Sequence, residues 1–173
     1  MTDDILVVTF TATNHILGAL TRSGGPPAKV TPQDVVGDDG LVLRLAGTPA
    51  LSVTVDPGQL SVTSIAASNE ALLLRPTSYV LSGTPPQAYE KLDTSTEPTV
   101  TFDSPTGTVT VTVVHAATGD RDLFLLIGKT PIPMKLPATA FSVGAAASPP
   151  SGDNAYLLLF PNYQGMFGTI TVP

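Results

Sequence analysis

The sequence contains no cysteine and no tryptophan. Without cysteine the chain cannot form a disulfide framework or a cysteine-based zinc site, so packing alone must stabilise its core. Its 173 residues are enough for one large domain or two small ones that bury a core without such cross-links. The lack of tryptophan also removes the broadest of the aromatic platforms that sugar-binding sandwiches usually present.

Charged side chains are scarce as well. They make up 13% of the residues, about half of the roughly 25% typical of soluble domains, and the net charge is −6. The eight lysines and arginines occur singly along the chain, so they predict no basic stripe that would neutralise a run of phosphates. This pattern excludes nucleic acid as a partner. A largely neutral, hydroxyl-rich surface instead favours association with copies of the chain or with other subunits of an assembly.

Targeting segments are also missing. The start, MTDDILVVTF, is acidic and leads into a short β-branched run, whereas a secretory signal needs a basic start and an apolar helical segment. No run approaches the length of a membrane-spanning helix. We therefore expect no signal peptide in this chain and no membrane insertion. For an extracellular or virion location, either a natural signal has been cut away and a Met added, or the protein is made in the cytoplasm and leaves by another route, such as lysis of a host cell.

A period of two takes the place of helical periodicity. Valines and threonines alternate over 108–113, and Leu6, Val8 and Phe10 share one face of the first strand. Strands are predicted at 5–13, 16–21, 41–46, 50–55, 59–66, 71–75, 78–82, 98–102, 107–116, 122–127, 139–144, 155–160 and 166–172. The predicted fold is all-β: an antiparallel β-sandwich of jelly-roll or immunoglobulin-like type, as two small sandwiches in tandem.

The best candidate for a linker is SGTPPQAYEKLDTSTEPT, residues 82–99. This segment lacks apolar alternation and gathers proline, serine, threonine and charge. It predicts an N-terminal sandwich over 1–95 and a C-terminal sandwich over 96–173. A single larger sandwich, in which 82–99 forms a long crossover loop, is the alternative.

A polar turn followed by an apolar run occurs four times along the chain. The copies are VGDDGLVLRL (36–45), ASNEALLLRP (67–76), TGDRDLFLLI (118–127) and SGDNAYLLLF (151–160). Their spacing is too irregular for a solenoid, so they are first of all turns. In the last three copies another apolar strand precedes the turn. This order predicts a hairpin or corner whose second strand is buried on both faces or under a partner.

The C-terminal half carries a family resemblance. An alternating strand GTVTVTV (107–113) is followed by the turn GDRDLF (119–124), then by AYLLL (155–159) and by the ending YQGMFGTITV (163–172). In this order the segments resemble the bacterial pre-peptidase C-terminal domain, a β-sandwich module found behind secreted proteases. The proline-rich segment KTPIPM (129–134) departs from the family pattern. The resemblance implies a monomeric secreted binding module for calcium, a polysaccharide or a matrix protein.

One pair of carboxylates has the spacing of a candidate metal site. Asp120 and Asp122 lie two residues apart at the entry to a strand, and together with loop carbonyls they would supply oxygen ligands for calcium. The alternative is that each aspartate bonds a nearby backbone N–H group, as aspartates in turns often do. Calcium is the only cofactor that the sequence suggests.

No catalytic residue is predicted. The two histidines are His15 and His115, and a catalytic histidine needs both a nucleophile and an orienting acid beside it. Serine and aspartate are too common here to single out such partners. His115 continues the parity of the valines at 109–113, which predicts a position on the core face at the end of the strand. The chain is therefore predicted not to be an enzyme.

The leading interpretation is a non-enzymatic structural protein that self-associates or decorates a larger particle, such as a virion, a phage tail or an extracellular filament. The predicted interface residues are the outward threonines Thr108, Thr110 and Thr112, and Tyr163 in the loop 161–165. Edge-strand pairing or docking of apolar-sided strands between subunits would be the mechanism. The alternative is the monomeric binding module that the resemblance implies.

Overall fold

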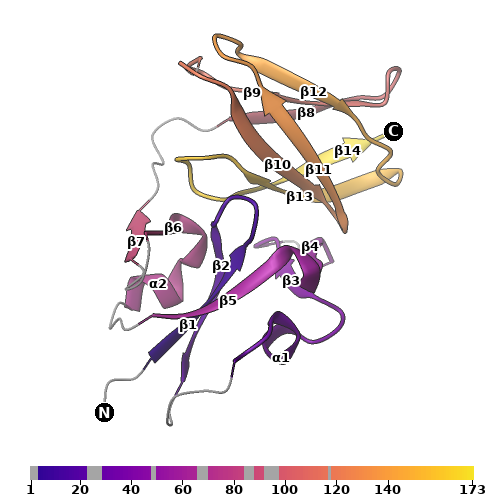
Figure 1. Ribbon diagram of the computed structural model, residues 1–173. Coiled ribbons are helices and arrows are strands. Elements are labelled where there is room, and N and C mark those ends of the chain that lie inside the picture. The colour runs from indigo at the N-terminus through magenta and orange to yellow at the C-terminus, as the bar shows by residue number, and fades with distance from the viewer. Residues whose placement is uncertain are drawn as a thin grey trace. The chain divides into compact units, whose positions relative to one another are not determined.

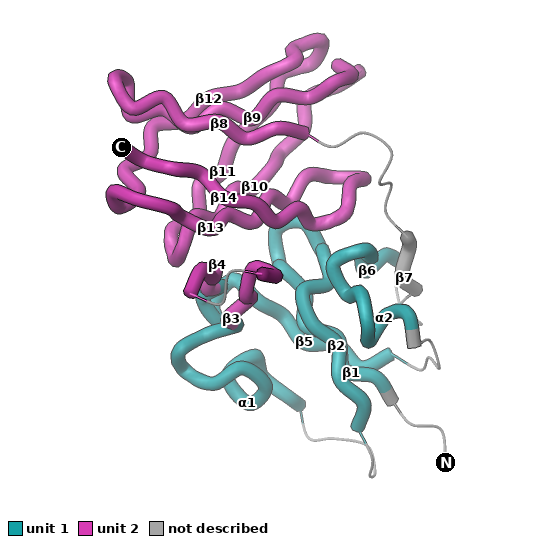
Figure 2. The backbone as a smooth tube through the Cα atoms, turned by 180° about the vertical axis from the view of Figure 1, so that it is seen from behind, with its two compact units in different colours: residues 1–41, 55–93 teal, residues 42–54, 94–173 magenta. Residues whose placement is uncertain are grey.

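The structure is a computed structural model, and it describes residues 4–22, 29–47, 50–65, 70–83, 88–91, 98–116 and 118–173. Its sheets are antiparallel, and the prediction of an all-β, sandwich-like fold is confirmed. Two compact units are present, one of residues 1–41 and 55–93, the other of 42–54 and 94–173 (Figure 2). Residues 42–54, which the predicted division places in 1–95, thus belong to the second unit. The predicted boundary at 95/96 lies outside the described residues.

The strands and helices are labelled in chain order (Figure 1). They are β1 (Asp4–Phe10), β2 (Ile16–Arg22), α1 (Pro32–Val36), β3 (Leu41–Arg44), β4 (Ser52–Val55), η1 (Pro57–Gln59), β5 (Leu60–Ile65), α2 (Glu70–Leu74), η2 (Pro76–Ser78), β6 (Tyr79–Ser82), β7 (Ala88–Lys91), β8 (Thr99–Asp103), β9 (Thr108–Thr112), β10 (Arg121–Ile127), β11 (Thr130–Leu136), β12 (Ser142–Ala146), β13 (Gly152–Leu159) and β14 (Met166–Val172).

The first unit is built on a three-stranded sheet of order β2-β1-β5. Its core includes Ile5 and Val7 of β1, on which Leu72 of α2 also packs. Tyr79 and Leu81 of β6 pack against the same core, and β6 pairs with β7 in a second, two-stranded sheet. Leu6, Val8 and Phe10 on the other face of β1 are also buried, so this strand is covered on both faces.

Two buried polar side chains of this unit, Thr9 and His15, make hydrogen-bonding contacts. The pairing of β1 with β2 shifts register between Val8 and Thr9, and the Thr9 side chain is fully buried. Its hydroxyl lies 2.6 Å from the Ser61 hydroxyl on β5. His15 is also buried, and its Nδ1 lies 2.8 Å from the Thr13 hydroxyl. These contacts offset the cost of removing polar atoms from water.

The second unit contains two facing sheets. One has the strand order β11-β10-β13-β14 and the other has the order β12-β9-β8 (Figure 1). Val109 and Val111 of β9 meet Leu123 and Leu125 of β10 in a common core, together with Leu158 of β13. The hairpin of β3 and β4 joins this unit through the Thr54 N–H, which donates to the Gly128 carbonyl at 2.7 Å.

Two of the four turn-plus-apolar segments become the central strands of the four-stranded sheet. β10 and β13 pair directly, with Phe124 opposite Leu159 and Ile127 opposite Tyr156. In β13 the side chains of Ala155, Tyr156, Leu157, Leu158 and Leu159 are all buried, although successive residues point to opposite faces. The prediction of a strand buried on both faces is confirmed for this segment.

The prediction of a strand at 71–75 is wrong, because these residues form most of the helix α2. Glutamate, alanine and leucine favour helices, and the segment contains no β-branched residue. The same Leu-Leu-Leu run occurs in β13, but there strand pairing on both sides decides the conformation. A short apolar run alone cannot distinguish these outcomes.

Two further predictions on the second unit are corrected. The strand predicted at 107–116 ends at Thr112, and His115 is exposed rather than on the core face. The alternation of buried and exposed side chains fails there because the pairing of β9 with β12 ends at the bond from the Val113 N–H to the Phe141 carbonyl. The strand β11 was not predicted, because Pro131 and Pro133 read as turn signals.

Candidate functional site

The predicted interface threonines lie on the outer face of the sheet β12-β9-β8. Thr108, Thr110 and Thr112 alternate along β9, while the valines between them point into the core. The opposing residues on β8 are Asp103, Thr101 and Thr99, and those on β12 are Ala146, Gly144 and Ser142. These nine residues, all exposed or half-buried, are called the threonine face.

The threonine face is uncharged except at one corner. Within its three strands, which the structure describes throughout, Asp103 is the only outward residue with an ionisable side chain. Its carboxylate accepts a hydrogen bond from the Thr106 hydroxyl in the adjoining turn. Directly opposed side chains on antiparallel strands lie about 5 Å apart, so Thr101 and Thr110 are neighbours within an array of threonines on β8 and β9. Because its side chains are small, this face is expected to be nearly flat.

Two exposed apolar residues lie just beyond the ends of β9 and β12 that carry Thr112 and Ser142. Phe141 is 56% exposed and Val114 is 58% exposed. Phe141 immediately precedes Ser142, and its carbonyl accepts the bond from Val113, so both apolar residues flank the end that carries Thr112. An exposed aromatic ring beside an uncharged sheet is typical of an interaction surface.

Tyr163 lies elsewhere in the second unit. It is half-buried, and its ring centroid lies 5.2 Å from that of Phe160 with a tilt of 35°. Phe160 is buried in the core, and Tyr163 packs at the margin of that core. The Arg121 guanidinium lies 5.9 Å from the Phe160 ring centroid and completes this cluster. The ring therefore stabilises the sandwich, and a contact with a partner stays a prediction.

Asp120 supports a neighbouring turn. Its Oδ1 accepts a hydrogen bond from the Ala138 N–H at 2.9 Å, and its Oδ2 lies 3.5 Å from the Lys135 Nζ. The Ala138 N–H, with a smaller contribution from Lys135, lowers the pKa of Asp120 below its usual range. Both side chains of the ion pair are more than half exposed, so the pair itself contributes little stability.

Asp122, the second predicted calcium ligand, is exposed on β10 opposite Lys135. Among the described residues, no three histidine, aspartate or glutamate side chains gather as a metal cluster. Calcium prefers six to eight oxygen ligands, and one oxygen of Asp120 already holds the Ala138 amide. Calcium binding therefore stays a prediction, checked by whether added calcium raises the thermal midpoint.

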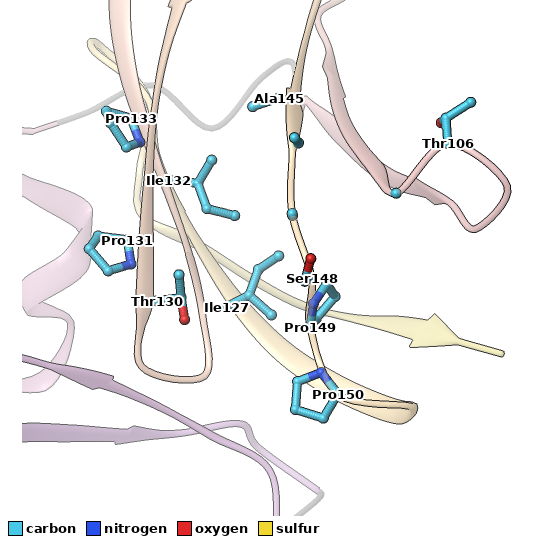
Figure 3. A pocket seen from close by; sticks show the side chains of 13 residues that line it. Thr106, Ile127, Thr130, Pro131, Ile132, Pro133, Ala145, Ser148, Pro149 and Pro150 are labelled. Carbon is cyan, nitrogen blue, oxygen red and sulfur yellow. The ribbon is translucent and has the colours of Figure 1, made fainter.

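A cavity that sequence reasoning missed lies in the second unit. It has a volume of about 640 Å³ and opens between β11 and the segment 145–150. Figure 3 shows Ile127 and Ile132 pointing toward this segment, with Thr106 on its other side. No motif marks the cavity in the sequence, because its walls come from separate segments brought together by the fold.

Comparisons with known proteins found no match to a family model, to a curated protein or to a solved structure. Across the described ranges, no helix combines the length and apolar character needed to cross a membrane.

Proposed function

We propose that the chain is a non-enzymatic structural subunit that associates with copies of itself, or with a larger particle such as a virion, a phage tail or an extracellular filament, through its threonine face. The observation that carries this proposal is an outward sheet face that bears a single charged side chain. Protein interfaces are depleted of charge at their centre and enriched in aromatic residues.

The chemistry of this face suits contact with a second copy. Threonine hydroxyls both donate and accept hydrogen bonds, so two such arrays can satisfy one another without burying a charge. Thr110 lies at the centre, between Thr101 and Gly144. In an interface with two-fold symmetry, a central residue faces the same residue of the other copy or lies close to it.

This arrangement makes Thr110→Lys the sharpest test. A lysine at the centre would bring like charges together in the contact, and we expect the association constant to fall at least about tenfold. The monomer should stay folded, because Thr110 points away from the core. Sedimentation velocity across a concentration series measures the association, and circular dichroism checks the fold.

The matched control is Thr169→Lys, which places the same charge at an exposed threonine of β14 on the other sheet. We expect this variant to associate as the unchanged protein does. Equal association of Thr110→Lys and the unchanged protein would remove the threonine face from consideration.

The cavity favours a second function, that of a binding module. Its volume falls within the 300–1,000 Å³ typical of ligand pockets, and its mouth opens at a sheet edge. This alternative places the functional surface at β11 and β12 instead of the threonine face. It predicts a monomer that binds a ligand. The mass of such a monomer in solution stays constant as the protein concentration rises, whereas the mass of a self-associating subunit increases.

A further inference from the structure

The strand β12 has an open edge with unused backbone groups. The Val113 N–H donates to the Phe141 carbonyl at 2.8 Å, and the Ala147 N–H donates to the Gly107 carbonyl at 2.9 Å. These bonds continue the β9–β12 ladder at both ends, so the odd-numbered residues of 141–147 face β9. In an antiparallel ladder the intervening residues turn both N–H and C=O away from the neighbour. Ser142, Gly144 and Ala146 therefore point these groups off the edge of the sheet.

This edge carries none of the usual protection against strand addition. β12 has no charged residue, no proline and no bulge, and its pairing with β9 is continuous over 142–146. Its edge-facing residues have small, exposed side chains that would not obstruct another strand. Natural edge strands that must stay unpaired usually carry lysine, proline or a bulge.

The neighbouring edge of β11 is blocked. Pro131 and Pro133 pair with Leu126 and Phe124 of β10, and proline has no N–H to donate. Prolines are tolerated within a sheet where their nitrogen faces off its edge. Figure 3 shows their rings on the opposite side of β11 from Ile132, and all three residues line the cavity. The two edges that border the cavity thus differ, because only β12 offers a regular row of donors and acceptors.

The cavity beside this edge is uncharged. Its lining residues, all within the described part of the chain, include no ionisable side chain. Ile127 and Ile132 form an apolar wall that faces the segment carrying Ala145 (Figure 3), and the small residue Ala147 also lines the cavity. A charged group of an occupant would lose its hydration there without gaining a partner, so the site selects uncharged groups.

We propose that the edge of β12 and the adjoining cavity bind an extended, uncharged peptide segment of a partner protein, which pairs with β12 and inserts alternate apolar side chains against Ile127 and Ile132. The edge-facing groups recur every two residues, about 6.8 Å apart, and an extended polypeptide carries donors and acceptors at the same spacing. Backbone pairing gives the affinity, and the cavity gives the preference for apolar side chains.

The size of the site favours a peptide over a second folded copy. Three edge-facing residues and a cavity of about 640 Å³ accommodate a short strand. A stable interface between folded proteins buries about 1,200–2,000 Å², which is more than a short strand edge provides. The proposal does not depend on self-association, because the threonine face points away from the sandwich and the β12 edge points along the sheet.

The test uses the full chain at a concentration where it is monomeric, and a capped peptide of about seven residues in which valine alternates with serine and threonine. Labelled peptide binding is followed by fluorescence anisotropy, and the amide signals of Ser142, Gly144 and Ala146 are followed by NMR. We expect saturable binding and shifts centred on these amides. A peptide N-methylated at alternate nitrogens should bind at least about tenfold more weakly, because it loses donors and gains a steric clash.

Ala146→Pro is the matching protein variant, because it removes an edge-facing donor in the way that Pro131 and Pro133 do on β11. We expect this variant to stay folded and to bind the peptide at least about tenfold more weakly. Thr110→Lys, on the outer face of β9, should leave peptide binding unchanged, which separates this proposal from the proposed self-association.

Three results would overturn the proposal. The first is the absence of peptide binding at millimolar concentration. The second is that the methylated peptide binds as tightly as the unmethylated peptide, or that folded Ala146→Pro binds the peptide as tightly as the unchanged protein does. The third is a shift of the same three amides on raising the protein concentration without peptide, because the edge would then be an interface between copies.

Discussion

The absence of a side chain at Gly168 is required by Tyr156, which lies on the neighbouring strand. They lie opposite one another on β14 and β13. A side-chain carbon at Gly168 would overlap the Tyr156 ring, which is buried at the margin of the core. Gly168 therefore provides the space into which the tyrosine ring packs, and its lack of a side chain, rather than an unusual backbone angle, is what the fold requires.

We therefore predict that Gly168→Ala destabilises the chain by about 1–3 kcal/mol, because the ring must move within a packed region. Urea denaturation measures this change. Gly119→Ala is the control, since a carbon added at Gly119 meets no atom within 4 Å. Equal stability of Gly168→Ala and Gly119→Ala would contradict the packing described for Tyr156.

Asp120 gives a prediction on pH. Its pKa is lowered in the folded chain, first by the Ala138 N–H, so its ionised form adds stability at pH values above the pKa of the unfolded chain. This contribution is lost as the pH falls through the unfolded pKa toward the lowered folded value. Asp120→Asn should therefore melt at a lower temperature than the unchanged protein near pH 7, and the difference should shrink in acid.

Scanning calorimetry between neutral and acidic pH checks this expectation, with Asp122→Asn as the control for loss of a nearby exposed carboxylate. A difference between Asp120→Asn and the unchanged protein that stays constant with pH would argue against the carboxylate bond to Ala138.

At the scale of the element, β13 decides the architecture of the second unit. Leu157 and Leu158 point to opposite faces of the sheet, yet both are fully buried. We predict that Leu157→Ala and Leu158→Ala each destabilise the chain by about 2–5 kcal/mol, because each leaves a cavity in a packed region. Leu74→Ala on α2, where the leucine is 78% exposed, is the control and should be nearly neutral.

Denaturant unfolding of the three variants measures these changes. A neutral Leu157→Ala beside a destabilised Leu158→Ala would mean that only one face of β13 is buried. That result would contradict the burial on both faces that the apolar segment predicts and the structure shows.

Several elements of the fold were predictable because alternation determines them locally. The valines and threonines of β9 divide between core and surface as their sequence indicates, and the ending 166–172 forms β14 over the same residues. The runs at 71–75 and 130–136 were not predictable in this way. The first is decided by whether a partner strand is present, and the second by Pro131 and Pro133 lying at edge positions that only the sheet defines.

The same contrast holds for the candidate sites. The outward threonines of β9 follow from alternation alone, but their opposite neighbours on β8 and β12 depend on register. The cavity has no local signal, because Ile127, Ala145 and Thr106 are brought together only by the packing of the two sheets. The bond from Ala138 to Asp120 joins residues eighteen positions apart and was equally hidden.

At the scale of the whole molecule, the low charge content of the chain and the nearly uncharged threonine face both favour association with other subunits. Charged residues make up 13% of the chain, and the threonine face carries one of them. A monomer gains solubility from surface charge, whereas a subunit that is covered by its neighbours does not need it. The composition of the chain and the register of β8, β9 and β12 therefore support the same proposal, that of a subunit in an assembly.

The solution mass, measured by light scattering behind a sizing column over a concentration series, tests the proposal of self-association most directly. We predict a mass that rises well above 17.8 kDa with concentration, and a return toward 17.8 kDa in Thr110→Lys but not in Thr169→Lys. A chain that stays at 17.8 kDa up to high concentration would contradict self-association through the threonine face.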